Sequence, residues 1–171
     1  MMKQAFFVLT LVFFQSVGFT KTREAEKSRF TYDIIGSQST QNGNRYSEIN
    51  LGLNWFLQDW LIWRNSAFQR QSQNVDPVYG IDSSIRLQEE WLNDDRSLGF
   101  KIFGGPGVRA ASSDSNAYFG EAGVGIRLGG VNLGAGVKSI KYFSTRKDKD
   151  GVPLPKDENQ VFFTISGGGS L

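Results

Sequence analysis

Apolar and polar residues alternate along eight segments of this chain. A period of two puts successive side chains on opposite faces of an extended chain, so each segment is typical of a β-strand with one apolar face. The predicted strands are Phe30 to Ser37, Asn44 to Phe56, Trp60 to Arg70, Val78 to Glu90, Ser97 to Ala110, Asn116 to Leu128, Val131 to Phe143 and Gln160 to Gly169. No stretch keeps a helical period over a useful length, so we predict an all-β protein.

The connections between these strands are tight and long in turn. The second, fourth and sixth are short, at Leu57 to Asp59, Trp91 to Arg96 and Gly129-Gly130. The odd-numbered connections are mostly longer and very polar, up to Ser144 to Asn159. Consecutive strands joined in this way predict an eight-stranded antiparallel up-and-down barrel.

The pair Gly129-Gly130 predicts the most specific hairpin, since two-residue hairpin turns need positive φ. Pairing Leu128 with Val131 then sets the register of both strands. The apolar face pairs Ile126 with Leu133, Val124 with Ala135 and Ala122 with Val137; the other face pairs Arg127 with Asn132, Gly125 with Gly134, Gly123 with Gly136 and Glu121 with Lys138.

Two places break the alternation. In the third strand, Ile62 and Phe68 fall among Arg64, Ser66 and Arg70, which predicts a bulge or a misplaced boundary. Pro106 lies inside the fifth strand, where a residue without an N–H group predicts a bulge or a strand end.

Alternation alone does not decide which face of the barrel is apolar: a membrane barrel is apolar outside, whereas a soluble ligand-binding barrel is apolar inside. Aromatic placement favours the membrane barrel. All four tryptophans lie near the short turns, and four tyrosines lie where strands meet the long loops, which predicts two aromatic girdles at opposite rims. The predicted girdle residues are Trp55, Trp60, Trp63 and Trp91 at one rim and Tyr46, Tyr79, Tyr118 and Tyr142 at the other.

The polar face of such a barrel would line a lumen only just wide enough for side chains. Glycines at 123, 125, 134 and 136 would leave one wall bare for long side chains from the others. The charged residues expected to fill the lumen are Asp33, Glu48, Arg64, Asp82, Arg86, Glu90, Lys101, Arg109, Glu121, Arg127 and Lys138. We expect these charges to pair and to form a plug; an ion-conducting lumen is the alternative.

The N-terminal residues have the features of a secretory leader. Lys3, an apolar run and the small residues before Gly18 predict a signal peptide over residues 1–18. Residues 19–29 are polar and unpatterned, and predict a tether before the barrel of residues 30–171.

Composition excludes several kinds of chemistry. The 171 residues contain no cysteine and no histidine, which removes disulfides, thiol catalysis, the commonest general base and the commonest transition-metal ligand. Asp148 to Gly151 matches the opening of a calcium loop but lacks the later acidic ligand, so we predict a turn there. A formal net charge of +2 gives no reason to expect a nucleic-acid partner. We predict no enzyme, metal or cofactor.

In strand number, loop alternation, girdles and charged interior, residues 30–171 resemble the small eight-stranded outer-membrane barrels of Gram-negative bacteria, the group that contains the transmembrane domain of outer membrane protein A. The final strand carries Val161, Phe163 and Ile165 at alternate positions, as substrates of the barrel-assembly machinery do. The resemblance implies export to the outer membrane and a monomer among outer-membrane lipids. Some barrels of this size modify lipid A, but they use a histidine that this chain lacks.

Four functions remain open at this point: a filled barrel with a structural or surface-interaction role, a small porin-like pore, a soluble barrel that holds an apolar ligand, and an adhesin. Loss of cell binding on shortening Ser144 to Asn159 would separate the adhesin from the others. Lys141, Arg146, Lys147 and Lys149 cluster near that loop, so they are candidates for contact with lipopolysaccharide phosphates.

Overall fold

The computed structural model describes residues 30–41, 43–94 and 97–167. They form eight β-strands: β1 (Phe30–Gln41), β2 (Asn44–Gln58), β3 (Leu61–Ser72), β4 (Val78–Leu92), β5 (Leu98–Ala111), β6 (Ala117–Leu128), β7 (Val131–Tyr142) and β8 (Asp157–Gly167). The predicted leader and tether at residues 1–29 lie outside the described residues.

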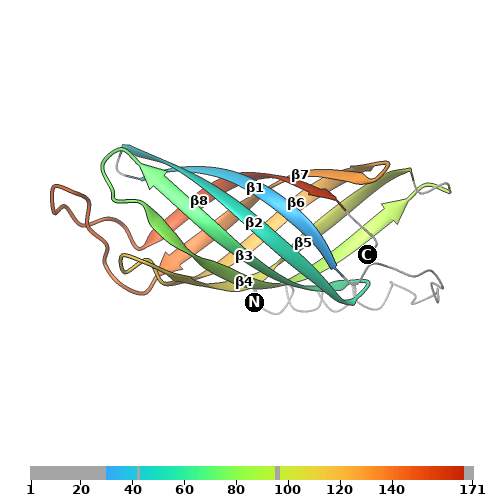
Figure 1. The fold of residues 1–171 in the computed structure, drawn as a ribbon, viewed down its shortest axis with the longest axis horizontal. Coiled ribbons are helices and arrows are strands. Elements are labelled where there is room, and N and C mark those ends of the chain that lie inside the picture. Colours follow the sequence, from blue (N-terminus) through green and yellow to red (C-terminus); the bar gives the residue numbers. More distant parts are fainter. Residues whose placement is uncertain (1–29, 42, 95–96, 168–171) are drawn as a thin grey trace, which may run out of the picture.

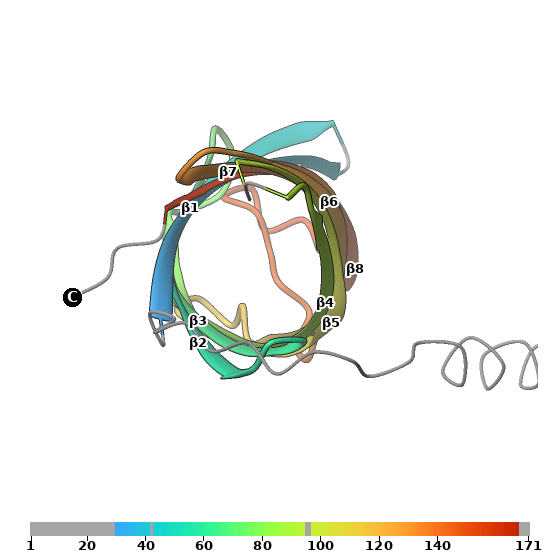
Figure 2. The same cartoon turned by 90° about the vertical axis from the view of Figure 1, so that its right-hand side faces the viewer.

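Each strand pairs antiparallel with the next, and β1 pairs with β8, so the sheet closes into a barrel. Figure 1 shows that the strands run obliquely to the long axis of the barrel. Figure 2 shows the closed ring viewed from one end. Closure pairs the edges that an open sheet would leave with free backbone groups. The predicted all-β, eight-stranded up-and-down barrel is therefore confirmed.

The two ends of the barrel differ in their connections. We call the end with the β2–β3, β4–β5 and β6–β7 connections the turn rim; β1 begins there, since Phe30 pairs with Trp55. The opposite end, the loop rim, carries the other four connections, of which the longest spans residues 143–156 between β7 and β8. That loop extends from the left end of the barrel in Figure 1.

Several strands run further toward the loop rim than the sequence predicts. β1 continues to Gln41 and β8 begins at Asp157, so the first connection at the loop rim spans only residues 42–43. These added residues are polar on both faces, which removes the alternation that marks a strand, while their ladder pairs continue. The first and last loops are accordingly shorter than expected.

The hairpin around Gly129-Gly130 has the predicted register. Leu128 pairs with Val131, and the ladder continues through Glu121 opposite Lys138. Gly129 has φ of 60°, a value that glycine adopts without a steric penalty.

The two irregularities predicted in the strands do not occur as expected. β3 pairs with β4 in unbroken register, and Ile62 and Phe68 are simply buried in the lumen. A register shift lies instead between Phe56 and Gln58, at the β2–β3 turn. At Pro106 the β4–β5 pairing is interrupted between Ser84 and Leu87, but the register is the same on both sides, so there is neither a bulge nor a strand end.

The apolar faces of the strands point outward. Leu51, Phe163 and Val161 are among the large hydrophobic side chains that are more than half exposed along the barrel wall. The inward positions hold buried polar and charged side chains with a smaller set of aromatic and aliphatic ones. The alternative of a soluble ligand-binding barrel requires an apolar lumen, and the described strands do not have one.

Candidate functional site: the charged interior and the loop rim

The eleven charged residues predicted for the lumen all lie at inward-facing strand positions. Eight of them are buried: Asp33, Glu48, Arg64, Asp82, Arg86, Arg109, Glu121 and Lys138. Glu90, Lys101 and Arg127 are half-buried near the turn rim. Strand alternation aims these residues inward, and the closed sheet brings them together from different strands.

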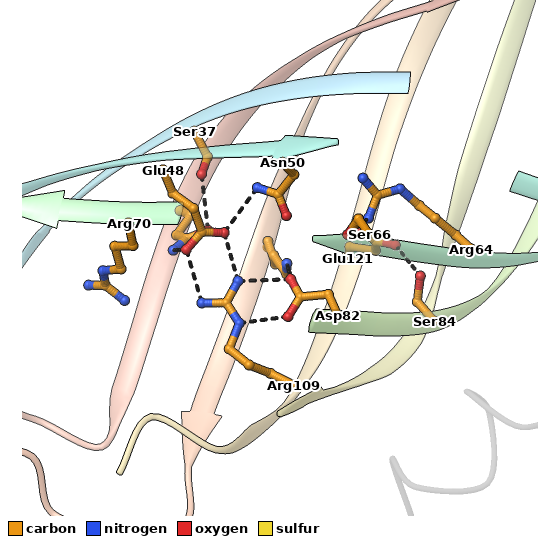
Figure 3. Close-up of polar contacts among 12 residues, drawn as sticks. Ser37, Glu48, Asn50, Arg64, Ser66, Arg70, Asp82, Ser84, Arg109 and Glu121 are labelled. Carbon is orange, nitrogen blue, oxygen red and sulfur yellow. Dashed lines mark hydrogen bonds and ion pairs between the residues drawn. The ribbon is translucent and has the colours of Figure 1, made fainter. Parts of the chain in front are cut away.

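Arg109 of β5 lies at the centre of this network (Figure 3). Its guanidinium donates two hydrogen bonds to Asp82, of 2.7 and 2.8 Å, and two to Glu48, of 3.0 and 2.7 Å. Asp82 also pairs with Lys138 Nζ at 2.5 Å. The Arg109 guanidinium thus links β2, β4 and β5, and Lys138 connects β7 to the same network.

A second group of charges lies around Asp33 and Glu121. Arg64 binds Asp33 through two hydrogen bonds of 2.9 and 2.7 Å, and Arg86 binds Glu121 through two of 2.6 and 3.1 Å. Arg86 also lies 3.7 Å from Asp33, which links the two pairs. Bidentate pairs of this kind hold both side chains in one orientation.

Glu121 and Lys138 are directly opposite in the ladder, but their charged groups bind other partners. Lys138 reaches Asp82 and Glu121 reaches Arg86, both on β4. The lumen is narrow enough for long side chains to cross it, so pairing follows the geometry of the whole ring.

Aromatic rings line the same space and stack against the cations. Arg109 lies 3.9 Å above the Phe68 ring centroid, Lys138 4.0 Å above Phe119 and Arg86 5.0 Å above Phe103. Cation–π contact adds attraction where the charge has already lost its water. Each of these cations is therefore held by a ring as well as by a carboxylate.

Lumen glycines lie where these large side chains meet the wall. A Cβ at Gly123 would come within 2.5 Å of Phe103, and one at Gly125 within 2.8 Å of Lys101. A Cβ at Gly136 would come within 2.5 Å of Phe162. The glycines thus provide room for the side chains that lie beside them on the neighbouring strands β5 and β8.

Little free space remains between these side chains. The internal cavity bordered by Glu48, Arg64, Glu121, Lys138 and Phe162 has a volume of about 10 Å³. A cavity needs roughly 10 to 15 Å³ to hold one water molecule. This cavity therefore has room for about one water molecule at most.

A third group of charges near the loop rim was not predicted from the sequence. Glu158 of β8 pairs with Arg70 of β3 at 2.8 Å and accepts a hydrogen bond from Tyr142 of 2.8 Å. Arg146 of the β7–β8 loop lies 3.8 Å from the same carboxylate. Glu158 was missed because the predicted strand begins only at Gln160, although Glu158 shares the inward alternation of Gln160 and Thr164.

Aromatic residues at the two rims divide between outside and inside. Trp55, Trp60, Trp63 and Trp91 are exposed at the turn rim, and Tyr79 and Tyr118 are exposed on the wall toward the loop rim. Tyr46 and Tyr142 are only 2% exposed and lie in the lumen, so their assignment to a girdle is wrong. Both occupy inward positions, two residues from buried Glu48 and Ile140 respectively.

The four cations proposed for lipopolysaccharide contact also divide. Lys141, Lys147 and Lys149 are exposed at the loop rim. Arg146 is 6% exposed and points into the barrel, so it is not available as a surface contact. Burial lowers the pKa of its guanidinium from the usual value, although an arginine remains charged at neutral pH.

Among the described residues, no group of three acidic side chains is placed to hold a metal ion. No helix in this part of the chain is long and apolar enough to span a membrane.

Two solved structures are similar to this barrel. The crystal structure of Neisserial surface protein A matches 85% of this chain and 100% of that chain, with a TM-score of 0.56 and 11% sequence identity. The crystal structure of the outer membrane enzyme PagL matches 78% of this chain and 97% of that chain, with a TM-score of 0.49 and 17% identity. No family model and no curated protein matches the sequence. By its strand topology and its likeness to the neisserial protein, this chain has the fold of the small eight-stranded outer-membrane barrels.

Proposed function

We propose that this protein spans the bacterial outer membrane as a monomeric barrel with a closed interior, and that its role is structural or lies in surface interactions of its loop rim. The observation that carries the proposal is the division of the wall into an apolar outside and a paired, charged inside. An apolar surface of this extent would favour aggregation in water, whereas the hydrocarbon core of a membrane solvates apolar side chains. The likeness to a neisserial surface protein supports a location at the bacterial surface.

Export through the predicted leader and insertion by the barrel-assembly machinery belong to this proposal. The test is to fractionate cells and run the outer membrane on a denaturing gel with and without boiling. We expect a band whose mobility changes on heating, because a closed membrane barrel resists detergent until it is heated. A soluble protein without a heat-dependent shift would contradict the proposal.

A closed interior predicts that the barrel does not conduct ions. Arg109, Asp82 and Glu48 cross the middle of the lumen, and the adjoining cavity of about 10 Å³ leaves no continuous water path there. In planar bilayers we expect purified protein to give no stepwise current, and an established porin serves as the positive control. Regular single-channel steps would instead support the small pore.

We propose no catalytic activity for this barrel. The chain has no histidine or cysteine, and its buried carboxylates are held by arginine or lysine side chains. A carboxylate that is saturated by cations is a poor general base. Incubation with lipopolysaccharide should therefore leave its acyl chains intact, which mass spectrometry of the lipid would show.

Lipopolysaccharide itself is the partner that we propose for the loop rim. The ammonium of Lys141 lies 3.9 Å from Asp157, and that of Lys149 lies 4.0 Å from Asp76. Exposed pairs at such distances contribute little, so these cations and Lys147 are open to lipid phosphates. Replacing all three lysines by glutamine should weaken binding to phosphorylated lipid A and leave binding to dephosphorylated lipid A unchanged. Equal loss with both lipids would contradict a phosphate contact.

A further inference from the structure

The β7–β8 loop folds over the mouth of the barrel and sends one arginine inward. Figure 2 shows this loop crossing the opening of the ring. Arg146 donates hydrogen bonds to Gln41 at 3.0 Å and to the Pro155 carbonyl at 3.2 Å, and its guanidinium lies 3.3 Å from the Tyr142 ring centroid. Leu154 of the same loop is buried. The loop-rim end of the lumen is therefore enclosed.

Among the described residues, Glu158 is the buried carboxylate at this end of the lumen, and both of its oxygens are already occupied. Glu158 Oε1 accepts hydrogen bonds from Ser39 at 2.5 Å and from Gln160 at 3.0 Å. Its Oε2 accepts one from Tyr142 and pairs with Arg70, each at 2.8 Å. Glu158 cannot satisfy further donors.

Four buried side-chain atoms around it nevertheless have no hydrogen-bond partner. They are Tyr46 Oη, Arg70 Nη2, Ser72 Oγ and Arg146 Nε, and all four can donate. They belong to one cluster: the Arg70 guanidinium lies 4.0 Å from the Tyr46 ring centroid, Tyr46 pairs with Ser72 across β2 and β3, and Arg70 and Arg146 share Glu158. A buried donor that is left unpaired loses its hydrogen bond to water without replacement, so four in one place require an explanation.

Charge balance identifies what is missing. Deeper in the lumen, the buried carboxylates Asp33, Glu48, Asp82 and Glu121 match the buried cations Arg64, Arg86, Arg109 and Lys138 one for one. At the loop rim, Arg70 and Arg146 share Glu158 as their ion-pair partner among the described residues, whereas Asp148 of the same loop and Glu48 act only from beyond ion-pair distance. Within ion-pair distance this cluster holds two guanidinium groups and one carboxylate, and four of its buried donor atoms have no acceptor.

We propose that the loop-rim end of the lumen binds one small monovalent anion, of the halide class, between Arg70, Arg146, Tyr46 and Ser72. An anion of this kind accepts hydrogen bonds from any direction and neutralises the second guanidinium. Its size is limited because the β7–β8 loop crosses the opening of the barrel above these side chains. By holding Arg146 inside, the anion also fixes that loop to the barrel.

The test compares the thermal unfolding of the detergent-solubilised full barrel in chloride with that in gluconate at equal ionic strength. We expect the melting temperature to rise and saturate with chloride, since a ligand that binds only the folded state stabilises it. Crystals grown with bromide should show an anomalous peak beside Arg70 and Arg146. Equal melting curves in both salts, or ordered water at this place without bromide, would overturn the proposal.

Two variants separate specific binding from a general salt effect. Arg146→Gln should lower the apparent affinity for chloride at least tenfold, whereas Lys147→Gln, which removes the adjacent exposed charge, should leave it unchanged. Tyr46→Phe keeps the ring beneath Arg70 and removes one donor, so it should weaken binding without loss of the barrel. Chloride dependence that survives both Arg146→Gln and Tyr46→Phe would place the effect elsewhere and overturn the site.

Discussion

Buried charge is the dominant chemistry of individual side chains in this protein. Arg109 is held by Glu48 and Asp82, and neither carboxylate has access to water. A buried ion pair gains little net stability over apolar groups of the same shape, because both charges lose their hydration. The penalty for leaving one member alone is much larger, so these pairs fix one arrangement of the lumen.

Arg109→Met tests this asymmetry. The substitution retains most of the side-chain volume but leaves Glu48 and Asp82 short of a cation, which should lower the free energy of unfolding by about 3 to 5 kcal/mol. Arg127→Met is the matched control, because the Arg127–Glu90 pair is 33% and 22% exposed and contributes only about 0 to 1 kcal/mol. Urea unfolding in detergent micelles measures both. If both variants lowered the free energy of unfolding equally, burial of the Arg109 ion pairs would not explain the cost of breaking them.

Within the strands, glycine positions decide where large side chains lie. On the inward face of β7, a Cβ at Gly136 would meet the Ala122 carbonyl oxygen and come within 2.5 Å of Phe162. On the outward face of β6, a Cβ at Gly120 would meet nothing within 4 Å. Glycine is therefore needed at position 136 to make room for Phe162, whereas Gly120 borders open space.

Gly136→Ala should accordingly destabilise the barrel by about 1 to 3 kcal/mol, the usual cost of overpacking. Gly120→Ala should be neutral or slightly stabilising, because it restricts the unfolded chain without a clash. Heating samples stepwise before gel electrophoresis would give the unfolding temperature of each variant. A lower temperature for Gly120→Ala than for Gly136→Ala would show that the inward face is not tightly packed.

For the barrel as a whole, the proposed membrane location makes the cost of a charge on the wall depend on depth. Val124 and Leu128 are both outward on β6 and almost equally exposed, at 49% and 47%. Leu128 lies next to the β6–β7 turn, whereas Val124 lies further inside the apolar belt. Exposure to water alone would not distinguish the two positions.

Val124→Arg should impair insertion by about 2 to 4 kcal/mol, and Leu128→Arg by about 0 to 1 kcal/mol, as expected for midplane and interfacial positions of a membrane barrel. Folding into lipid vesicles, followed by the heat-dependent gel shift, measures the difference. Equal behaviour of the two variants would contradict a bilayer around this wall.

Local sequence was sufficient for much of the architecture. The Gly129-Gly130 turn and the alternation on either side predicted the β6–β7 register, which the structure confirms through Glu121 and Lys138. Strand ends were less accurate, because polar residues such as Gln38 to Gln41 carry no alternation once both faces leave the apolar belt. Alternation also places Tyr46 and Tyr142 on the inward face. Their position near the long loops instead led to the prediction that they belong to a girdle.

The order of the strands and the alternation of side chains along each strand thus follow from the sequence, because a two-residue period and a tight turn act between near neighbours in the chain. The ion-pair partners inside the lumen do not follow from the sequence. Lys138 binds Asp82 although Glu121 lies opposite it in the ladder, and Arg146 enters the barrel from a loop that resembles a solvated surface segment. Only the closed ring decides these contacts, since it sets which side chains reach across the lumen and leaves too little space for any other arrangement.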